Sequence, residues 1–396
     1  MHNHLSTSSF NSHPKMPRDS NRLCLKFFLA TLPFSVIFTF ALVMLFVSGE
    51  LLSVDRVIQM QKENATPVLF GFGYSDPDLY YKMKSVLIRN PEVLVLGTSR
   101  VLQIRSGFFL NSRFYNAGRA IAKVGHLRHF LAQIPKEKEP RVILLGLDQN
   151  FFNAAWDRSV GLYDIEQRYI CVDSRFRIIG ENWFRIFKDY KKRKFSIRNI
   201  LKKDAHVKRI GLNAIINDLG YRNDGSQRND KFIEGAEDPK NPDYQFRETF
   251  DHISKGINRF EFGDEPAVDV LRELDRFLSE CKIRNIYVVG FLNPYPHAVW
   301  EKLKSTKKHR YLFQLAATLK PLFANQGYSF SDFSDLADLG AADQENLDGF
   351  HASEKAYLRL LIQILEKDSV LRRHADLGGL KDFLASSVNP HNVFPD

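Results

Sequence analysis

The sequence predicts an α/β fold with a central, mostly parallel sheet in a three-layer sandwich, preceded by one transmembrane helix. Runs of consecutive apolar residues at 93–97, 141–146 and 286–291 are typical of strands buried on both faces of a parallel sheet. Helical patterns lie between these runs, and the alternation predicts right-handed βαβ units. A long uncharged stretch at 27–48 predicts the membrane helix.

The composition is that of a folded protein with a sizeable core. The chain has 396 residues, of which 44% are hydrophobic and 13% aromatic, and this excludes a disordered chain. The formal net charge is +10, which suits nucleic acid, anionic lipid headgroups or acidic glycans as partners. The net charge does not distinguish among these partners, so the cellular location of the chain has to.

Residues 27–48 carry no charged side chain and are long enough to cross a hydrocarbon core of about 30 Å. A cleaved signal peptide is the alternative, but its apolar core is only about 7–15 residues long. We therefore expect an uncleaved anchor. Acidic residues, Glu50 and Asp55, follow the stretch. Basic residues precede it: Lys15, Arg18, Arg22 and Lys26. The positive-inside rule places a polar tail, residues 1–26, in the cytoplasm and exports the rest, and this topology disfavours nucleic acid as a partner. We therefore expect no nucleic-acid partner.

The exported part is predicted to have three sections. Residues 49–90 are expected to be a stalk and entry segment, and residues 91–380 the α/β domain. Residues 381–396 are expected to be a tail with little structural signal. An insertion at about 151–260 interrupts the domain, because its pattern loosens into loops and aromatic patches. We expect this insertion to form a lid over the strand ends.

Within the domain, the elements follow in a regular order. A helix at 121–134 has Val124, Leu127 and Phe130 on one face and connects the first two buried strands. An amphipathic helix at 266–283 precedes the third strand. Further elements are a helix at 307–325, a short strand at 328–333 and a final helix at 354–366, for which Ser353 is the expected N-cap.

The insertion contains a strongly basic run at 188–203. Such a run is usually a solvated face. In an anchored protein it can also lie on anionic headgroups or on an acidic polymer. The sequence leaves these alternatives open.

The cysteines are Cys24, Cys171 and Cys281. Cys281 continues the apolar spacing of the helix at 266–283, which predicts a core thiol. A Cys171–Cys281 disulfide is compatible with an oxidising compartment, but spacing alone does not establish it. The chain has no CxxC pair and no HExxH motif, so we expect neither a metal site nor an organic cofactor.

Polar residues follow the predicted strands. They are Ser99, Gly118, the segment Asp148–Asn150, and Asp348 with His351. Sites in open α/β sheets form beyond the carboxyl ends of strands. Acyl transfer needs a nucleophile, a base, a group that orients the base, and donors for the oxyanion. Ser99 can be the nucleophile, His351 the base and Asp348 its orienter. The backbone N–H groups of Ser99 and Gly118 can form the oxyanion hole.

Each of these residues also has a structural interpretation. Serine is an ordinary turn residue, and His351 alone would be a loop histidine. Arg100 and Arg119 either bind an anionic substrate group or lie on the surface. Asp148 is expected to be structural and to pair with one of these arginines.

Two more polar residues follow the third strand. Asn293 and His297 can line the pocket, although loops after strands are commonly polar.

The motifs do not match the G-x-S-x-G elbow of α/β-hydrolases, because Arg100 and Val101 follow Ser99. The pattern instead resembles the SGNH (GDSL-like) hydrolase superfamily. The matching blocks are Gly97–Arg100, Asn116–Gly118, Gly146–Asn150 and Asp348–His351. More specifically, the chain resembles membrane-anchored bacterial relatives of the alginate and lipoteichoic-acid modification factors. The resemblance covers about residues 90–150 and 250–365.

The resemblance implies a flavodoxin-like sandwich and a Ser-His-Asp esterase or O-acyltransferase. It further implies a cell-envelope glycan or lipid-linked polymer as substrate, a bacterial inner membrane location with the domain in the periplasm or at the cell surface, and a membrane-bound acyltransferase as partner. One departure matters: Asp148 holds the position of the family's oxyanion Asn, and a carboxylate repels an oxyanion. Asn150 can substitute. The alternative is an inactive envelope protein of this fold that binds a polysaccharide or an assembly partner.

Overall fold

The computed structural model describes residues 18–64, 66–110, 113–160, 165–170, 172, 174–202, 204, 206–229, 233–235 and 238–394. Its centre is a parallel sheet of five strands, which confirms the predicted α/β class. The strands stand in the order β3-β2-β4-β8-β9. Their bounds are β2 Val93–Gly97, β3 Phe114–Gly118, β4 Val142–Leu147, β8 Tyr287–Leu292 and β9 Ser329–Asp332.

The strand order creates a crevice at one edge of this sheet. From β2 the chain moves outward to β3 and then returns past β2 to β4, so the order of the strands reverses between β2 and β4. In open α/β sheets, ligands bind beyond the carboxyl ends of the strands at such a switch point. Ser99 follows β2, and Asp148 follows β4, so both lie at this position.

Side chains of the parallel sheet alternate between two hydrophobic cores, as strand geometry requires. Leu94 and Leu96 of β2 join the core that also contains residues of α3, α4, α12 and α14. Val93 and Val95 join the core formed with α15 and α17. The bounds are α3 Asp78–Arg89, α4 Gly125–Ala132, α12 Val268–Ile283, α14 Leu315–Gln326, α15 Glu354–Lys367 and α17 Leu377–Ser386.

The helices of the domain differ from the expectation at three places. α4 is shorter than the predicted 121–134. An additional helix, α13 (His297–Thr306), occupies residues for which no element was predicted. The helix predicted at 307–325 begins only at Leu315, after a 3₁₀ turn at Arg310–Gln314. Lys307 ends α13 with a left-handed backbone (φ 55°), which the apolar pattern does not reveal. Ser353 caps α15 as expected, because its hydroxyl accepts the N–H of Ala356 at 3.3 Å.

Residues 49–90 are not a stalk. They form α2 (Val54–Glu63), β1 (Val68–Phe70) and α3, and β1 pairs with strands from the insertion. The resulting mixed sheet has the order β5-β1-β6-β7, with β5 Lys208–Ile210, β6 Leu219–Tyr221 and β7 Gln227–Asn229. Strands of three residues are too short to leave an alternating pattern in the sequence.

A buried lysine connects the small sheet to the large one. The Lys82 ammonium donates to the carbonyl of Asn116 on β3 at 3.0 Å and to the carbonyl of Gly225 in the turn between β6 and β7. It also lies 3.9 Å from the ring centroid of Tyr221. Burial lowers the pKa of Lys82 to about 7. The turn packs closely, since a side chain at Gly225 (φ 82°) would meet the Asn116 carbonyl.

The C-terminal segment packs against the domain instead of forming a separate tail. α17 crosses the expected boundary at residue 381. The Phe394 ring lies 5.6 Å from Phe108 and 4.9 Å from Phe383, and its N–H donates to Glu354 at 2.8 Å. These contacts are between residues distant in the chain, so composition did not indicate them.

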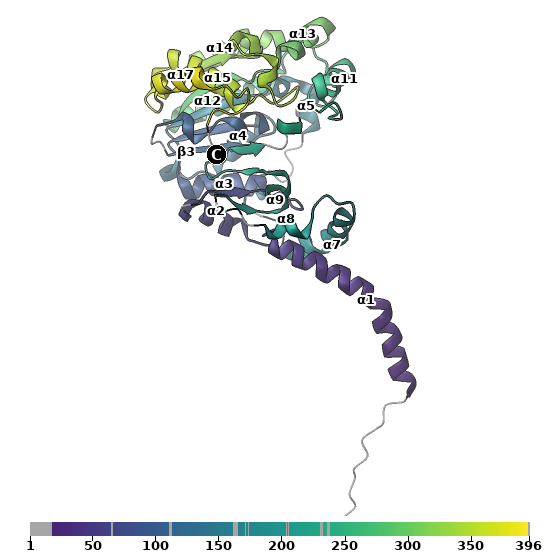
Figure 1. Ribbon diagram of the computed structural model, residues 1–396. Helices are drawn as coiled ribbons and strands as arrows, with labels where there is room; N and C mark the ends of the chain where they lie inside the picture. The colour runs from purple at the N-terminus through teal and green to yellow at the C-terminus, as the bar shows by residue number, and fades with distance from the viewer. Residues whose placement is uncertain are drawn as a thin grey trace, which may run out of the picture.

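The N-terminal helix α1 (Arg18–Val47) projects from the body of the molecule (Figure 1). Within the described part of the chain, it is the one helix long and apolar enough to cross a membrane, judged by length and composition. The insertion contributes α5 (Ala154–Ser159), α6 (Ile165–Ile170), α7 (Arg175–Lys191), α8 (Ile197–Leu201), α9 (Leu212–Asn217) and α11 (Arg247–Lys255). Of these, α7 lies beside the end of α1 nearest the body.

Of the two cysteines in the predicted domain, the structure tests only Cys281. Cys171 lies outside the described residues, so the Cys171–Cys281 disulfide stays an open alternative. Cys281 is fully buried on α12, and this burial raises the pKa of its thiol. It is a core thiol, as its helical spacing predicts.

Candidate active site

The structure brings Ser99, His351 and Asp348 together in a hydrogen-bonded chain. Ser99 Oγ lies 2.9 Å from His351 Nε2. On the other side of the ring, His351 Nδ1 lies 2.8 Å from Asp348 Oδ2. A carboxylate only accepts, so Nδ1 carries the proton and donates it to Asp348. Nε2 is then the acceptor for the Ser99 hydroxyl, which is the arrangement that an attacking serine requires.

The loop that carries Asp348 and His351 is held rigidly. Asp348 Oδ1 accepts the backbone N–H groups of Phe350 at 2.7 Å and of His351 at 2.6 Å. Between them, Gly349 donates its N–H to Asp243, and any side chain there would collide with Thr249 of α11. The insertion therefore fixes the position of the base.

The Asp348 carboxyl is charged in this environment. Burial disfavours the charge and acts to raise the pKa. The His351 imidazole and the backbone hydrogen bonds outweigh that effect, and they hold the pKa of Asp348 below its ordinary value. An ionised Asp348 stabilises the imidazolium that forms when His351 accepts a proton.

The three residues open into a cleft of about 720 Å³. Ser99, Asp348 and His351 line the cleft together with Trp156 of α5 and Ile165 of α6. The insertion thus contributes side chains to the site, and its action as a lid stays a prediction.

Arg119, Arg168 and Arg259 supply positive charge to the cleft. Arg119 pairs with Asp78 at 3.0 Å, and Arg168 lies 3.7 Å from Asp76. Both of these carboxylates also line the cleft. Arg119 is therefore committed to an internal ion pair instead of being free for an anionic ligand.

Arg259 differs from the other two arginines. Among the described residues, no carboxylate lies within ion-pair distance of its guanidinium, which stacks 4.9 Å from the Phe350 ring and 6.0 Å from the Trp156 ring. Its backbone is left-handed (φ 79°), a conformation uncommon for a residue with a side chain. Arg259 is thus an available cation beside His351.

Asp148 belongs to a buried network that also lines the cleft. Its carboxylate accepts from Thr98 Oγ1 at 2.8 Å and from Asn293 Nδ2 at 2.7 Å, and Arg100 lies 3.9 Å away. Tyr357 donates in turn to Asn293 at 2.9 Å. This is the structural role expected for Asp148, with Arg100 as the nearer arginine.

Arg100 is held by protein groups at the base of the cleft. Its side chain is fully buried, donates to Gln149 at 2.9 Å and to the Pro294 carbonyl at 2.7 Å, and stacks on Tyr295. Arg100 is also among the residues that line the cleft, and its Nε has no hydrogen-bond partner in the described part of the chain, so its anion-binding role stays a prediction. Asn293 is likewise buried, and it supports the network instead of lining the cleft.

The expected oxyanion donors are engaged or remote. The Gly118 N–H donates to Asn116 Oδ1 at 2.8 Å. Asn116 is held in this orientation because its amide donates to the Val101 and Ile104 carbonyls. Asn150 is buried, and neither it nor Gly118 is among the residues that line the cleft. Of the predicted donors, the Ser99 N–H alone remains at the cleft.

Several cleft residues were missed by the sequence interpretation. Thr98 could have been found, because it directly precedes the candidate nucleophile. Asp76, Asp78, Trp156 and Arg259 could not, because they come from segments interpreted as stalk and insertion. Their position in the site depends on how those segments fold back over the strand ends.

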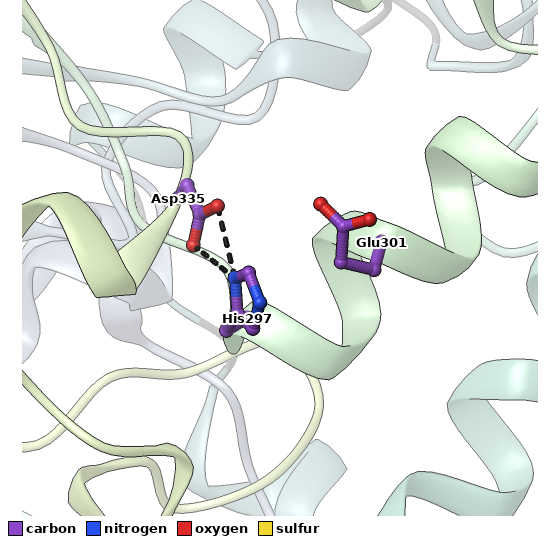
Figure 2. Close-up of side chains that lie close together, drawn as sticks. All are labelled: His297, Glu301 and Asp335. Atoms are coloured by element: carbon purple, nitrogen blue, oxygen red, sulfur yellow. Dashed lines mark hydrogen bonds and ion pairs between the residues drawn. The ribbon is translucent and has the colours of Figure 1, made fainter.

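His297 lies outside the cleft in a second cluster of titratable groups (Figure 2). It begins α13, with Glu301 one turn later and Asp335 on a neighbouring loop. His297 Nδ1 lies 3.1 Å from each oxygen of Asp335, and this hydrogen bond raises the pKa of His297. One ligand atom from each of the three residues lies within 4.8 Å of the others, a spacing that can hold a metal ion.

No family model matches the chain, and searches of curated proteins and of solved structures find no match either. The resemblance to SGNH hydrolases therefore rests on the sequence blocks around Ser99, Gly118, Asp148 and His351. The hydrogen-bonded geometry of Ser99, His351 and Asp348 is an observation independent of those blocks.

Proposed function

We propose that the protein is an SGNH-like serine esterase or O-acyltransferase whose three-layer α/β domain is anchored to a bacterial inner membrane by α1. The observation that carries the proposal is the hydrogen-bonded chain from Ser99 through His351 to Asp348, open to a cleft. A serine with only a turn role does not need a histidine on its hydroxyl, and a histidine with only a loop role does not need a carboxylate on its second ring nitrogen. The chain instead has the geometry of an activated nucleophile.

The reaction follows from the positions of these atoms. Ser99 Oγ attacks the carbonyl carbon of an ester while its proton passes to His351 Nε2. His351 then protonates the leaving alcohol oxygen, and the acyl group remains on Ser99. In the second half, water or a sugar hydroxyl gives its proton to His351 and attacks the acyl-enzyme, which returns the proton to Ser99. Water yields a free acid, and a sugar hydroxyl yields a new ester.

The cleft supports a polar, charged substrate. Its polar rim includes Arg259, whose guanidinium has no carboxylate partner in the described part of the chain. Guanidinium groups bind carboxylate and phosphate well. We therefore favour an ester on an acidic cell-envelope glycan or lipid-linked polymer, with a membrane-bound acyltransferase supplying the acyl group. An anchor with a cytoplasmic N-terminus keeps the domain on the exported side, near such a polymer.

A second function is favoured by the engaged oxyanion donors. Without the Gly118 N–H and an Asn side chain, the tetrahedral intermediate loses stabilisation that is worth about 2.7–4 kcal/mol per donor. The alternative is an inactive protein of this fold that binds an acidic polysaccharide or an assembly partner in the same cleft. This alternative predicts tight, salt-sensitive binding without turnover.

Labelling with a fluorophosphonate distinguishes these functions. We expect the full chain, purified in detergent, to form an adduct that peptide mass mapping assigns to Ser99. The adduct should be absent in Ser99→Ala and retained in Ser305→Ala, which changes an exposed serine on α13. If the unmodified chain is folded, as a cooperative melting transition would show, and is still not labelled, the result would contradict the enzymatic function and favour the binding function.

A further inference from the structure

The insertion helix α7 packs against the apolar helix α1 through aromatic rings. Trp183 lies 6.1 Å from Phe38, and Phe40 lies 6.4 Å from Phe187 and 4.9 Å from Tyr190, measured between ring centroids. α7 runs along the part of α1 nearest the body (Figure 1). These contacts lie within the apolar segment of α1, which extends to Val47.

The length of α1 places this contact at the membrane boundary. The apolar segment Arg22–Val47 has 26 residues and, at about 1.5 Å per residue, is about 39 Å long. The hydrocarbon core is about 30 Å thick and takes about 20 residues. A span of about 20 residues that begins at Arg22 ends at Ala41, so Phe38 and Phe40, which contact α7, lie at its outer boundary. Beyond this boundary, Met44 and Leu45 of α1 are buried against the domain.

The outer face of α7 carries apolar side chains that no described residue covers. Phe176 is 88% exposed and Phe184 is 50% exposed. With Gly180 between them, they follow one another at i, i+4 and i+8, which places them on one stripe of the helix. The opposite face, with Ile178 and Ile186, is buried against the domain. The exposed stripe continues the surface that packs on α1.

Basic side chains border this stripe. The Lys188 ammonium lies 5.8 Å from the Phe184 ring, and the Lys191 ammonium lies 5.7 Å from the Phe187 ring. Arg185, Lys188 and Lys192 also line a hollow of about 370 Å³, together with Glu181, Phe184 and Asp189. An apolar stripe bordered by lysines and arginines is the pattern of helices that lie in the membrane interface. An acidic polymer would bind the lysine and arginine side chains but would leave Phe176 and Phe184 exposed to water.

We infer that α7 lies on the surface of the membrane that α1 crosses, with Phe176 and Phe184 in the headgroup–acyl boundary and Lys188, Lys191 and Lys192 on lipid phosphates. The inference rests on the proposed membrane anchor and goes beyond it. Two attachments, α1 and α7, fix the orientation of the domain relative to the membrane plane. The distance between the cleft and the bilayer surface is therefore fixed as well.

Quenching of tryptophan by brominated lipids tests this surface. The full chain is reconstituted into nanodiscs of phosphatidylcholine and phosphatidylglycerol, with or without bromine on the acyl chains. Trp156→Phe/Trp300→Phe leaves Trp183 on α7, and Trp156→Phe/Trp183→Phe leaves Trp300 on α13 as the matched control. We expect the fluorescence of Trp183 to fall roughly twofold and that of Trp300 to stay unchanged, because the apolar face of an interfacial helix is buried about 5–10 Å into the headgroup/acyl boundary.

Charge substitution on the exposed stripe provides the second measurement. Phe176→Glu/Phe184→Glu should abolish the quenching of Trp183, whereas Phe383→Glu, at an exposed phenylalanine of α17, should not. Equal quenching of Trp183 and Trp300 would overturn the inference while leaving the anchor intact, provided that the chain floats with liposomes of the same lipids. Failure to float would overturn the anchor and this inference together, and neither result bears on labelling of Ser99.

Discussion

Two His–Asp pairs in this protein have nearly the same geometry and different surroundings. His351 Nδ1 lies 2.8 Å from Asp348, and His297 Nδ1 lies 3.1 Å from Asp335. Nε2 of His351 lies within hydrogen-bond distance of Ser99 Oγ in a cleft. The His297 side chain is instead 51% exposed and lies near Glu301 of its own helix (Figure 2). The comparison shows that an imidazole–carboxylate pair acquires a chemical role from the third group and from the cavity around it.

The largest effect should come from replacing the histidines. His351→Gln removes the base, and we expect ester turnover and Ser99 labelling to fall by about 10⁵–10⁶-fold. His297→Gln should leave both unchanged. Single-turnover assays with a chromogenic acetate ester would measure this. Equal losses in the two variants would mean that the pairs are not functionally different.

Replacing the carboxylates should give the next effect. Asp348→Asn keeps the shape of the loop but favours the wrong imidazole tautomer, and we expect kcat to fall by about 10³–10⁴-fold. Asp335→Asn is the matched change in the second pair and should preserve kcat. A wild-type kcat in Asp348→Asn would show that His351 is oriented by other contacts.

A smaller effect is expected at the cation beside the first pair. Arg259→Ala should raise KM about tenfold for an anionic ester such as 4-nitrophenyl hydrogen succinate, which corresponds to about 1.4 kcal/mol. KM for neutral 4-nitrophenyl acetate should not change, and Arg272→Ala, at an exposed arginine of α12, should alter neither value. The same rise for both esters would indicate a packing role for Arg259.

The smallest effect concerns stability, and its pH dependence has opposite sign in the two pairs. The pKa of His297 is raised in the fold, so its pairing stabilises the protein fully below the usual value of 6.5 and is lost as the pH rises through the raised pKa. The pKa of Asp348 is lowered, so its contribution is present above 3.8 and is lost as the pH falls through the lowered pKa.

Melting curves of the wild type, His297→Gln and Asp348→Asn from pH 3 to pH 9 would separate these contributions. The difference between wild type and His297→Gln should shrink above neutral pH and remain small throughout, because an exposed ion pair is screened by water. The difference for Asp348→Asn should instead shrink in acid. A His297→Gln difference that grows with pH would contradict the assigned pKa direction.

Local pattern explains which elements could be predicted. β2 and α15 each contain a run of apolar residues with clear period and ends, so their positions follow from residues close in sequence. α13 was missed because its end depends on the left-handed backbone of Lys307. The small sheet was missed because each of its strands is three residues long and is stable only through partners far along the chain.

The same distinction applies inside the site. Ser99, Asp348 and His351 could be proposed because each follows a recognisable strand or lies in a short motif with fixed spacing. The engagement of the Gly118 N–H could not be predicted, because the direction of a backbone N–H has no signature in the sequence. Whether the Gly118 N–H faces the cleft or Asn116 depends on hydrogen bonds that Asn116 makes to η1 (Ser99–Gln103) and the residue after it.

The sequence by itself determined the parallel sheet, the apolar N-terminal helix and the candidate residues Ser99, Asp348 and His351, because these depend on periodicity and spacing over short distances. The tertiary structure alone decided that Arg100 is buried while Arg259 is available. It also decided that the presumed stalk is folded and that α7 packs beside α1. The physical reason is that burial and pairing depend on which distant segments meet, and a linear pattern does not encode those contacts directly.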